Sequence, residues 1–232
     1  MNESEKFYLE SLYPLQDGVL SSIRKSTTPF FLTGGTALSR AYLNHRYSDD
    51  LDFFVNSDND FIIHVEQCLS QLLDDEYIWN EKKFIKTKDF CQYFIYTNHK
   101  PDVVLKVDFV NDIASHFGGI LETELFIKTD SVRNILSNKI SALFRLAAKD
   151  VVDLVYLAAN YSFHWSDIIN EAREKDSGIE ATVVSEILKT FPVKKLDEIN
   201  WVVKPNNERF MLNLMQMAKD CIEVKANSLY IQ

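Results

Sequence analysis

Two aspartates in the first quarter of the chain have the type and spacing of ligands for a cation. Asp50 and Asp52 begin the run 50–55, which has the composition of a strand, so their carboxylates point to one face while Leu51 and Phe53 point to the other. Two carboxylates on one patch repel each other and favour a cation between them. Hard oxygen ligands in this arrangement suit Mg²⁺, or Mn²⁺, bound together with the phosphates of a substrate.

A glycine pair upstream can hold such phosphates. Gly34 and Gly35 separate the short apolar run 29–33, which has the pattern of a buried strand, from a helical segment at 36–45. Free backbone N–H groups and the positive end of the helix dipole then face one point, and glycine lets the backbone approach an anion closely. A glycine pair alone is more often a structural turn, so this interpretation depends on the aspartates that follow it.

The clearest strand of the sequence, 103–110, supplies a third acid. In this strand Asp108 shares a face with Lys106, opposite an apolar face. We expect Asp108 to join the two aspartates at the cation, and the alternative is an acid on an exposed strand face. Asp102 and Asp112 are weaker candidates for the same place.

Two blocks of sequence resemble one enzyme family. Gly34-Gly35-Thr36-Ala37-Leu38, followed by Arg46-Tyr47-Ser48-Asp49-Asp50-Leu51-Asp52-Phe53-Phe54, resembles the signature of the AbiEii/AbiGii-type toxin family of nucleotidyltransferases, within the DNA polymerase β-like superfamily. The second block resembles the downstream helix motif of that family and consists of Lys139, Ala142, Leu143, Arg145, Lys149, Asp150, Asp153, Leu154 and Leu157. On one continuous helix Lys139 and Asp150 would lie about three turns apart, on the stripe that also holds Asp153. Without the first block, the second would indicate only an ion-paired helix surface.

The resemblance implies transfer of a nucleotide from an NTP to an acceptor hydroxyl, with release of pyrophosphate. It implies that Asp50 and Asp52 bind Mg²⁺ or Mn²⁺, and that Lys139 neutralises charge in the transition state. The third acid varies within this family, so Asp108 is expected as a metal ligand from its strand face alone. The residues implied to bind the NTP are Gly34, Gly35, Thr36, Arg46, Ser48, Lys139, Asp150 and Asp153. For Arg46, a role as a cation at the end of a helix fits equally well.

The same resemblance implies a biological role. It points to a toxin of phage defence or of a type IV toxin–antitoxin pair, with RNA such as the tRNA 3′ end as acceptor and a cognate antitoxin protein as partner. Two alternatives remain: a small-molecule nucleotidyltransferase of the antibiotic-modifying kind, and a non-catalytic relative that binds a nucleotide or a protein. An RNA acceptor would need basic side chains beside the site, and the candidates, which fit a solvated hairpin face as well, are Lys82, Lys83, Lys86, Lys88, Lys100 and Lys106.

The elements around these motifs indicate an α+β (α/β) fold. We expect a polymerase β-like mixed sheet flanked by helices in residues 1–128, and a mostly helical C-terminal domain in residues 129–232. The first helix is expected over 3–25 with an interruption at Pro14. Strands are expected near 77–86 and 90–97, and helical periodicity covers 131–160, 166–191 and 207–225.

Composition narrows the setting. The 232 residues are 46% hydrophobic, enough for a substantial core without disulfides, and the cysteines Cys68, Cys91 and Cys221 lack metal-binding spacing. An acidic N-terminus and the lack of an apolar run of about 18 residues predict a cytoplasmic protein that is not embedded in a membrane. The net charge of −9 disfavours broad, non-specific binding to nucleic acid.

Overall fold

The computed structural model describes residues 3–80 and 82–230. Contacts between Cα atoms divide the chain into two compact units. The first unit consists of Met1–Tyr42, Tyr47–Ile113 and Gly119–Asp130, and the second consists of Leu43–Arg46, Ala114–Gly118 and Ser131–Gln232. The division into domains at residue 128 stays a prediction about independent folding.

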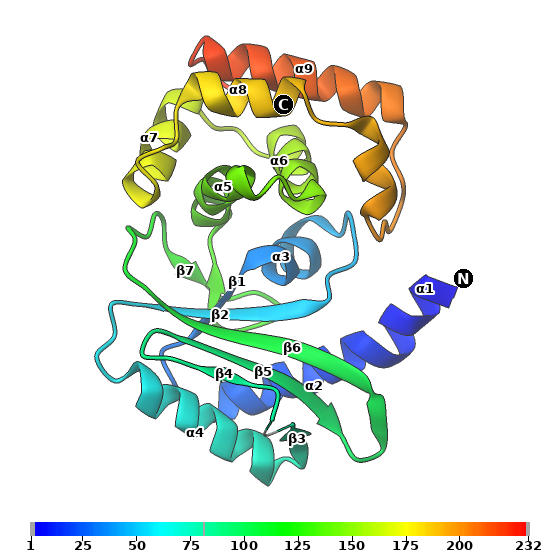
Figure 1. Cartoon of the computed structure of the whole chain (residues 1–232), viewed down its shortest axis with the longest axis vertical. Helices are drawn as coiled ribbons and strands as arrows, with labels where there is room; N and C mark the ends of the chain where they lie inside the picture. The colour runs from blue at the N-terminus through cyan, green and yellow to red at the C-terminus, as the bar shows by residue number, and fades with distance from the viewer. Residues whose placement is uncertain (1–2, 81, 231–232) are drawn as a thin grey trace. The chain divides into compact units, whose positions relative to one another are not determined.

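A mixed sheet forms the centre of the first unit (Figure 1). Its path is β3-β5-β6-β2-β1-β8-β7, with β4 paired to β5. Strand β2 pairs antiparallel with β1 and parallel with β6, so the sheet is mixed, as predicted. The strands are β1 (Phe31–Thr33), β2 (Asp50–Asn56), β3 (Tyr77–Trp79), β4 (Ile85–Lys86), β5 (Phe90–Thr97), β6 (Lys100–Asp112), β7 (Ile120–Leu121) and β8 (Thr129–Asp130).

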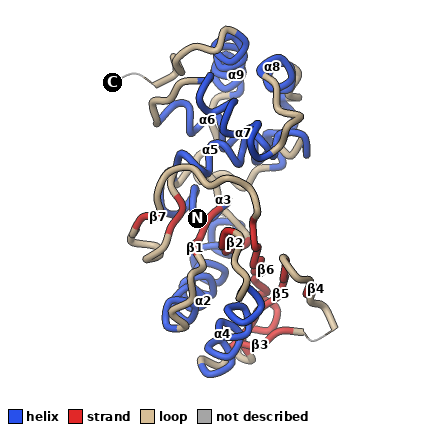
Figure 2. The backbone as a smooth tube through the Cα atoms, turned by 90° about the vertical axis from the view of Figure 1, so that its left-hand side faces the viewer, coloured by secondary structure: helices blue, strands red, loops and turns tan. Residues whose placement is uncertain are grey.

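Two helices, α2 (Tyr13–Lys25) and α4 (Phe61–Asp74), cover one face of this sheet and lie side by side in Figure 2. The face is apolar because alternate side chains of β2 and β6 are fully buried, and the ring of Phe30 contacts both Phe61 of α4 and Phe109 of β6. Burying one face leaves the opposite side chains of the same strands available for a polar site.

The first helical run is continuous, contrary to the expected interruption at Pro14. The segments α1 (Glu3–Phe7), η1 (Tyr8–Leu12) and α2 follow one another directly, and η1 is a wider, π-type turn. Because Pro14 lies in the first turn of α2, the N–H that it lacks falls where the backbone changes its hydrogen-bonding pattern. The chain therefore continues as a helix through the proline.

The glycine pair opens a helix, as predicted. Segment α3 (Gly34–Thr36) leads directly from β1 into the π-type segment η2 (Ala37–Leu43). Gly34 adopts φ +71°, a conformation that glycine takes without the cost that a side chain imposes. The helix begins at Gly34 rather than Thr36, and both glycines are inside its first turn.

The second unit is helical in its described residues. Its segments are α5 (Val132–Ser141), η3 (Ala142–Arg145), α6 (Ala148–Asn160), α7 (Trp165–Lys175), α8 (Ala181–Lys189), η4 (Val193–Glu198) and α9 (Asn207–Ile222). Helical structure covers most of the predicted range 131–160, but in separate helices, because α5 ends at Ser141 and Leu146 takes a left-handed conformation before α6. The predicted helical range 166–191 consists of α7 and α8.

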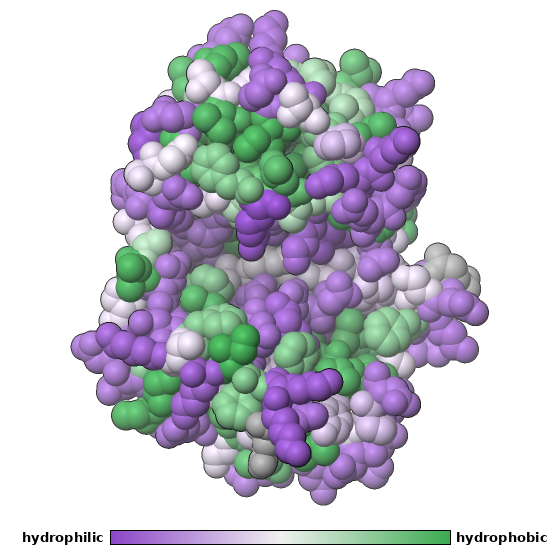
Figure 3. Space-filling model, in the orientation of Figure 1, coloured by the Kyte–Doolittle hydropathy of each residue, from purple (hydrophilic) through white to green (hydrophobic). Residues whose placement is uncertain are grey.

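Apolar side chains also reach the surface of the second unit. On the face shown in Figure 3 they gather around α8. The large apolar side chains of this unit that are exposed include Phe144, Leu146, Val183 and Val193. None of the helices in the described ranges combines the length and the hydropathy needed to cross a lipid bilayer.

Candidate active site

The parallel pairing of β2 with β6 gathers the predicted carboxylates. In this register Asp52 stands beside Asp108, and Asp50 stands beside Lys106. Neighbouring strands are about 4.8 Å apart, so the three carboxylates share one patch on the face that α2 and α4 leave uncovered. Asp108 is thus the acid of β6 that the register places next to the pair. We call Asp50, Asp52 and Asp108 the carboxylate cluster.

Lys106 lies between two members of the carboxylate cluster. Its ammonium is 3.0 Å from Asp50 Oδ2 and 2.8 Å from Asp108 Oδ2. Partial burial by itself would lower the pKa of Lys106, but hydrogen bonds and the charges of Asp108 and Asp50 outweigh it and raise the pKa above its ordinary value. The sequence placed Lys106 on the strand face of Asp108 as well as in a basic stretch, and the contact follows from that shared face.

Gln92 of β5 and Gly34 complete the surroundings of the carboxylate cluster. The Gln92 amide donates a hydrogen bond to Asp108 Oδ1 over 2.9 Å. On the other side, a Cβ added to Gly34 would lie 2.2 Å from Asp52 Oδ2, closer than any real contact. Glycine at position 34 therefore satisfies a left-handed backbone and also leaves the space that the Asp52 carboxylate occupies.

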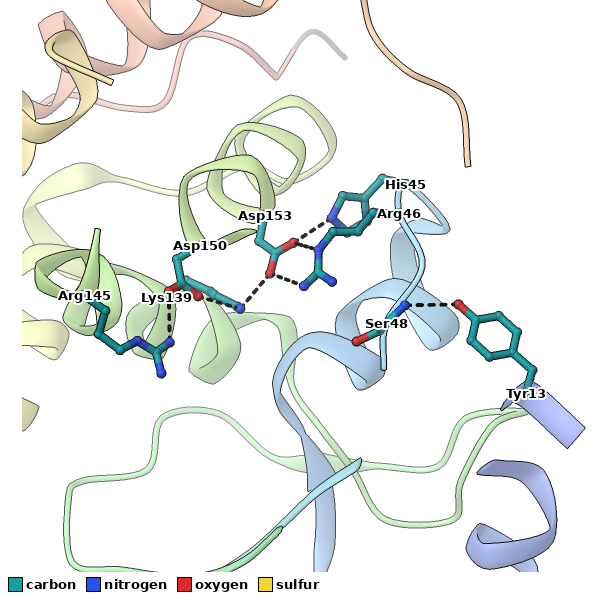
Figure 4. A network of polar contacts seen from close by, with 8 residues as sticks. All are labelled: Tyr13, His45, Arg46, Ser48, Lys139, Arg145, Asp150 and Asp153. Carbon is teal, nitrogen blue, oxygen red and sulfur yellow. Dashed lines mark hydrogen bonds and ion pairs between the residues drawn. The ribbon is translucent and has the colours of Figure 1, made fainter. Parts of the chain in front are cut away.

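Thr36 and Ser48, both predicted to bind phosphate, have contacts within the first unit. The buried Thr36 hydroxyl donates to the carbonyl of Asp50 and so ties the glycine-turn helix to the start of β2. The backbone of Ser48 donates from its N–H to the Tyr13 hydroxyl at 3.3 Å, a contact drawn in Figure 4, and accepts from the Gln16 amide at 3.0 Å. Helix α2 thus fixes the segment just before the carboxylate cluster.

The second block of predicted residues forms a buried ion network in the second unit (Figure 4). Arg46 makes a two-pronged contact with Asp153, with Nε 2.7 Å from Oδ1 and Nη2 2.8 Å from Oδ2. Lys139 contacts both acids of α6, at 2.6 Å from Asp153 Oδ2 and 2.9 Å from Asp150 Oδ1. Arg145 adds a more exposed contact to Asp150 at 3.0 Å. Arg46 is paired with a carboxylate, and its expected role in NTP binding stays a prediction.

The break between α5 and α6 allows Lys139 and Asp150 to come into contact. Eleven residues of continuous helix would separate Lys139 and Asp150 by about 16 Å along the axis. Instead η3 and the left-handed Leu146, at φ +52°, end α5 and start α6 in a new direction. The condition of one continuous helix does not hold, and the two side chains meet between two packed helices.

The charges in this network stabilise one another. Burial by itself would lower the pKa of Lys139, but the charges of Asp153 and Asp150 outweigh it and raise that pKa. Burial would raise the pKa of Asp153, but the charges of Lys139 and Arg46, with hydrogen bonds from Arg46 and His45, hold it well below its ordinary value. Both side chains are therefore ionised near neutral pH.

His45 belongs to the network, and no sequence motif pointed to it. Its Nε2 lies 2.8 Å from Asp153 Oδ1, while its Nδ1 is buried and has no hydrogen-bond partner among the described residues. This arrangement fits a neutral imidazole with the proton on Nε2, since a proton on Nδ1 would be left without an acceptor. Burial lowers the pKa of His45 below its ordinary value, which agrees with the neutral form.

The predicted basic stretch is divided between the two faces of the sheet. Lys106 points to the face of the carboxylate cluster, whereas Lys86 is paired in register with the buried Cys91 and forms an ion pair with Glu66 of α4. Lys100 donates to the backbone carbonyl of Glu10. These three lysines therefore do not form one groove.

The carboxylate cluster suits a divalent cation by the type of its donors, not by their present spacing. Three carboxylates supply hard oxygen ligands on adjacent strands, and Lys106 contacts two of them. Among the described residues, the group whose potential ligand atoms all lie within 4.8 Å of one another is Asp58, Asp60 and His64, on a half-exposed surface near the start of α4, and the carboxylate cluster does not meet that spacing. Exposed groups of this kind are common without a metal.

Together, the mixed sheet, the glycine turn and the adjacent strand acids define the class of protein as a nucleotidyltransferase. A family described as "Nucleotidyl transferase AbiEii toxin, Type IV TA system" matches residues 19–220. This chain belongs to that family, which confirms the resemblance carried by the two sequence blocks. The family implies an NTP substrate, a divalent metal and an antitoxin partner.

Solved structures share the fold. JHP933 from Helicobacter pylori is 22% identical, with a TM-score of 0.56 over 92% of this chain and 93% of that chain. MenT4, the nucleotidyltransferase toxin Rv2826c from Mycobacterium tuberculosis H37Rv, is 15% identical, with a TM-score of 0.62 over 92% of this chain and 84% of that chain. No curated protein matches the sequence. At these identities the structural likeness shows the fold alone.

Proposed function

We propose that this chain transfers a nucleoside monophosphate from an NTP to a hydroxyl of an RNA acceptor, as the toxin of a type IV toxin–antitoxin or abortive-infection system. The observation that carries the proposal is the carboxylate cluster, in which strand register places Asp108 beside Asp52. The acceptor hydroxyl loses its proton to solvent and its oxygen forms a bond to the α-phosphorus. The bond from the α-phosphorus to the oxygen that bridges to the β-phosphorus breaks, and pyrophosphate leaves with that oxygen.

The residues of the first unit have different chemical roles in the proposed nucleotide transfer. Asp50, Asp52 and Asp108 would hold Mg²⁺ or Mn²⁺, and the bound cation supplies positive charge to the phosphates and the acceptor oxygen. The backbone at Gly34 and Gly35 faces an anion without side chains in the way. The Ser48 hydroxyl is proposed to donate to a phosphate oxygen from a backbone that Tyr13 and Gln16 hold in place.

The residues of the second unit already contact carboxylates. The Lys139 ammonium contacts Asp150 and Asp153, so it could reach a phosphate with its third N–H or by giving up one of these acids. Arg46 contacts Asp153 through Nε and Nη2, which are two of the three nitrogens of its guanidinium. Their roles in NTP binding, and those of Thr36, Asp150 and Asp153, stay predictions.

An RNA acceptor is proposed because the chain belongs to a family of toxin nucleotidyltransferases, with the tRNA 3′ end as the first substrate to test. Lys106 is the lysine of the predicted basic stretch that lies at the carboxylate cluster. A small-molecule acceptor would require only the cluster and the NTP site. The two acceptor classes are separated by the product that carries the label.

The test uses the full chain with each of the four α-³²P NTPs, Mg²⁺ and total RNA. We expect label on RNA with the wild type and its loss in Asp50→Asn. Asp49→Asn is the matched control, because Asp49 directly precedes the strand and accepts a hydrogen bond from Tyr8 that an amide oxygen can still accept. Label that appears on small molecules alone, or that persists on RNA in Asp50→Asn, would contradict the proposal.

A further inference from the structure

Lys106 is positioned by the strand itself, so its contact with the carboxylate cluster is built into the register. On β6 it lies two residues before Asp108 and therefore on the same face, and across the parallel pairing it stands beside Asp50. Its ammonium contacts one oxygen of each of these acids, at 3.0 Å and 2.8 Å. The other oxygen of Asp108 accepts from Gln92, which leaves Oδ2 to the lysine.

The carboxylate cluster concentrates like charges. Asp52 and Asp108 stand side by side in the register, and like charges on neighbouring strands destabilise the sheet. A divalent cation would reduce this repulsion, but it binds the same carboxylate oxygens that the ammonium contacts. Two cations on the same oxygens repel each other strongly in a partly buried site.

We propose that Lys106 is the resident counter-ion of the carboxylate cluster, and that a divalent cation binds by exchange, with the ammonium giving up Asp50 and Asp108. The lysine side chain is 33% exposed while the two acids are 16% and 12% exposed, so it can turn toward solvent on a flexible stem. This inference rests on the proposed function, because it concerns the cation of the same site.

Exchange has two consequences for Lys106→Gln. Without the ammonium, the metal-free protein loses the ion pairs of Lys106 with Asp50 and Asp108, and so it should melt at a lower temperature in EDTA. The metal no longer competes with a cation, so its dissociation constant should fall about tenfold. Because binding to the folded state stabilises by linkage, the rise in melting temperature on adding Mg²⁺ should be larger in the variant than in the wild type.

Two variants keep this test specific. Lys86→Gln makes the same change in net charge, but Lys86 is paired with Glu66 on the opposite face of the sheet, so its metal affinity should stay that of the wild type. Lys106→Arg retains a cation at the cluster and should bind metal as the wild type does or more weakly. It also separates loss of charge from any general effect of replacing this side chain.

The experiment measures Mn²⁺ binding to the full-length proteins by electron paramagnetic resonance, together with thermal unfolding in EDTA and in Mg²⁺. Tighter Mn²⁺ binding by Lys106→Gln, abolished when Asp52→Asn is added, supports exchange at this cluster. Equal or weaker binding by Lys106→Gln, with the wild type still binding Mn²⁺ through Asp52, overturns the exchange and leaves the proposed function intact. If Asp52→Asn binds Mn²⁺ as the wild type does, both the exchange and the proposed function are overturned.

Discussion

Two groups of charged side chains, one in each unit, differ in balance and in access to water. In the carboxylate cluster of the first unit, three acids face one lysine whose side chain is one-third exposed. In the ion network of the second unit, Asp150 and Asp153 face Lys139 and Arg46, and all four are buried. In the first group Lys106 contacts two of the three acids next to solvent, and in the second group each acid contacts a buried cation.

This difference separates residues that can bind a charged ligand from residues that hold the fold. A buried charge costs several kcal/mol unless it is paired, so the members of the network depend on one another for the stability of their unit. The carboxylate cluster lies at a partly exposed surface, where a cation can reach its oxygens. Substitutions in the ion network should therefore lower stability, and substitutions in the carboxylate cluster should lower activity.

The largest predicted effect tests the structural side of this comparison. Asp153→Asn keeps the size of the side chain but leaves Lys139 and Arg46 with reduced compensation in a buried site. We expect the free energy of unfolding to fall by about 3–5 kcal/mol, measured by urea denaturation. Asp197→Asn, which breaks a surface pair with Lys204, should cost at most about 1 kcal/mol. A cost for Asp153→Asn as small as that of the control would show that the network is not needed for stability.

The next prediction tests the chemical side. Asp108→Asn should lower the rate of nucleotide transfer about 100-fold or more, because the third oxygen ligand loses its charge, while the free energy of unfolding changes little. The control is Asp112→Asn, on the same strand but paired in register with Asn56, beyond the cluster. Equal rates for the two variants would exclude Asp108 as the third metal ligand.

A third prediction concerns the glycine that borders the carboxylate cluster. Gly34→Ala would place a Cβ at a left-handed backbone and against the Asp52 carboxylate, so we expect a loss of about 2–3 kcal/mol in stability and a displaced Asp52 with weaker metal binding. Gly119→Ala, where an added Cβ meets nothing within 4 Å, is the matched control and should change stability by less than about 0.5 kcal/mol. Chemical denaturation and Mn²⁺ titration measure the two effects.

The sequence predicted the cluster better than the network, for a physical reason. Strand alternation is a local rule, so the common face of Asp50 and Asp52, and the face of Asp108, could be worked out from spacing. The pairing of β2 with β6 is a long-range contact. To predict the third acid, however, it was enough to find one more apolar strand with an acid on its polar face. This is why three residues predicted from separate segments lie on one patch.

The network could not be worked out in the same way. Its contacts depend on the break between α5 and α6, and Ala142–Ala147 contains neither glycine nor proline to indicate one. Leu146 adopts a left-handed conformation that a leucine rarely takes, and the packing of the two helices and the pairing of buried charges compensate for its cost. For the same reason His45, whose partner is 108 residues away, carried no signal in its own sequence.

A fourth prediction uses His45 to detect the network by pH. Burial lowers the pKa of His45 in the folded protein. As the pH falls below about 6.5, His45 is therefore protonated in the unfolded chain at a higher pH than in the folded protein. The free energy of unfolding should therefore decrease by up to about 1.4 kcal/mol per pH unit from this residue between that pH and the lower folded pKa. His45→Gln should remove this part of the slope, with His99→Gln at an exposed turn as the matched control for loss of an imidazole. An unchanged slope would show that His45 does not titrate differently in the two states.

The smallest predicted effect concerns how the helix before the family match supports the carboxylate cluster. The family match begins at residue 19, yet Tyr13 and Gln16 lie before it and hold the backbone of Ser48. Tyr13→Phe leaves the ring and its contact with Arg40 but removes the acceptor for the Ser48 N–H, which should cost about 1 kcal/mol in stability.

If Tyr13 has only a structural role, the loss of stability is the whole effect of Tyr13→Phe. If Tyr13 positions Ser48, the substitution should also change NTP binding. If the Ser48 backbone sets the position of its hydroxyl for a phosphate, Tyr13→Phe should raise the KM for the NTP while kcat for the bound substrate changes less. Tyr96→Phe on β5 is the control for loss of a phenol hydroxyl elsewhere in the same unit. A loss of stability in Tyr13→Phe with no change in KM would show that this helix contributes to folding and not to NTP binding. The N-terminal segment would then belong with the ion network, which stabilises the fold, and not with the carboxylate cluster.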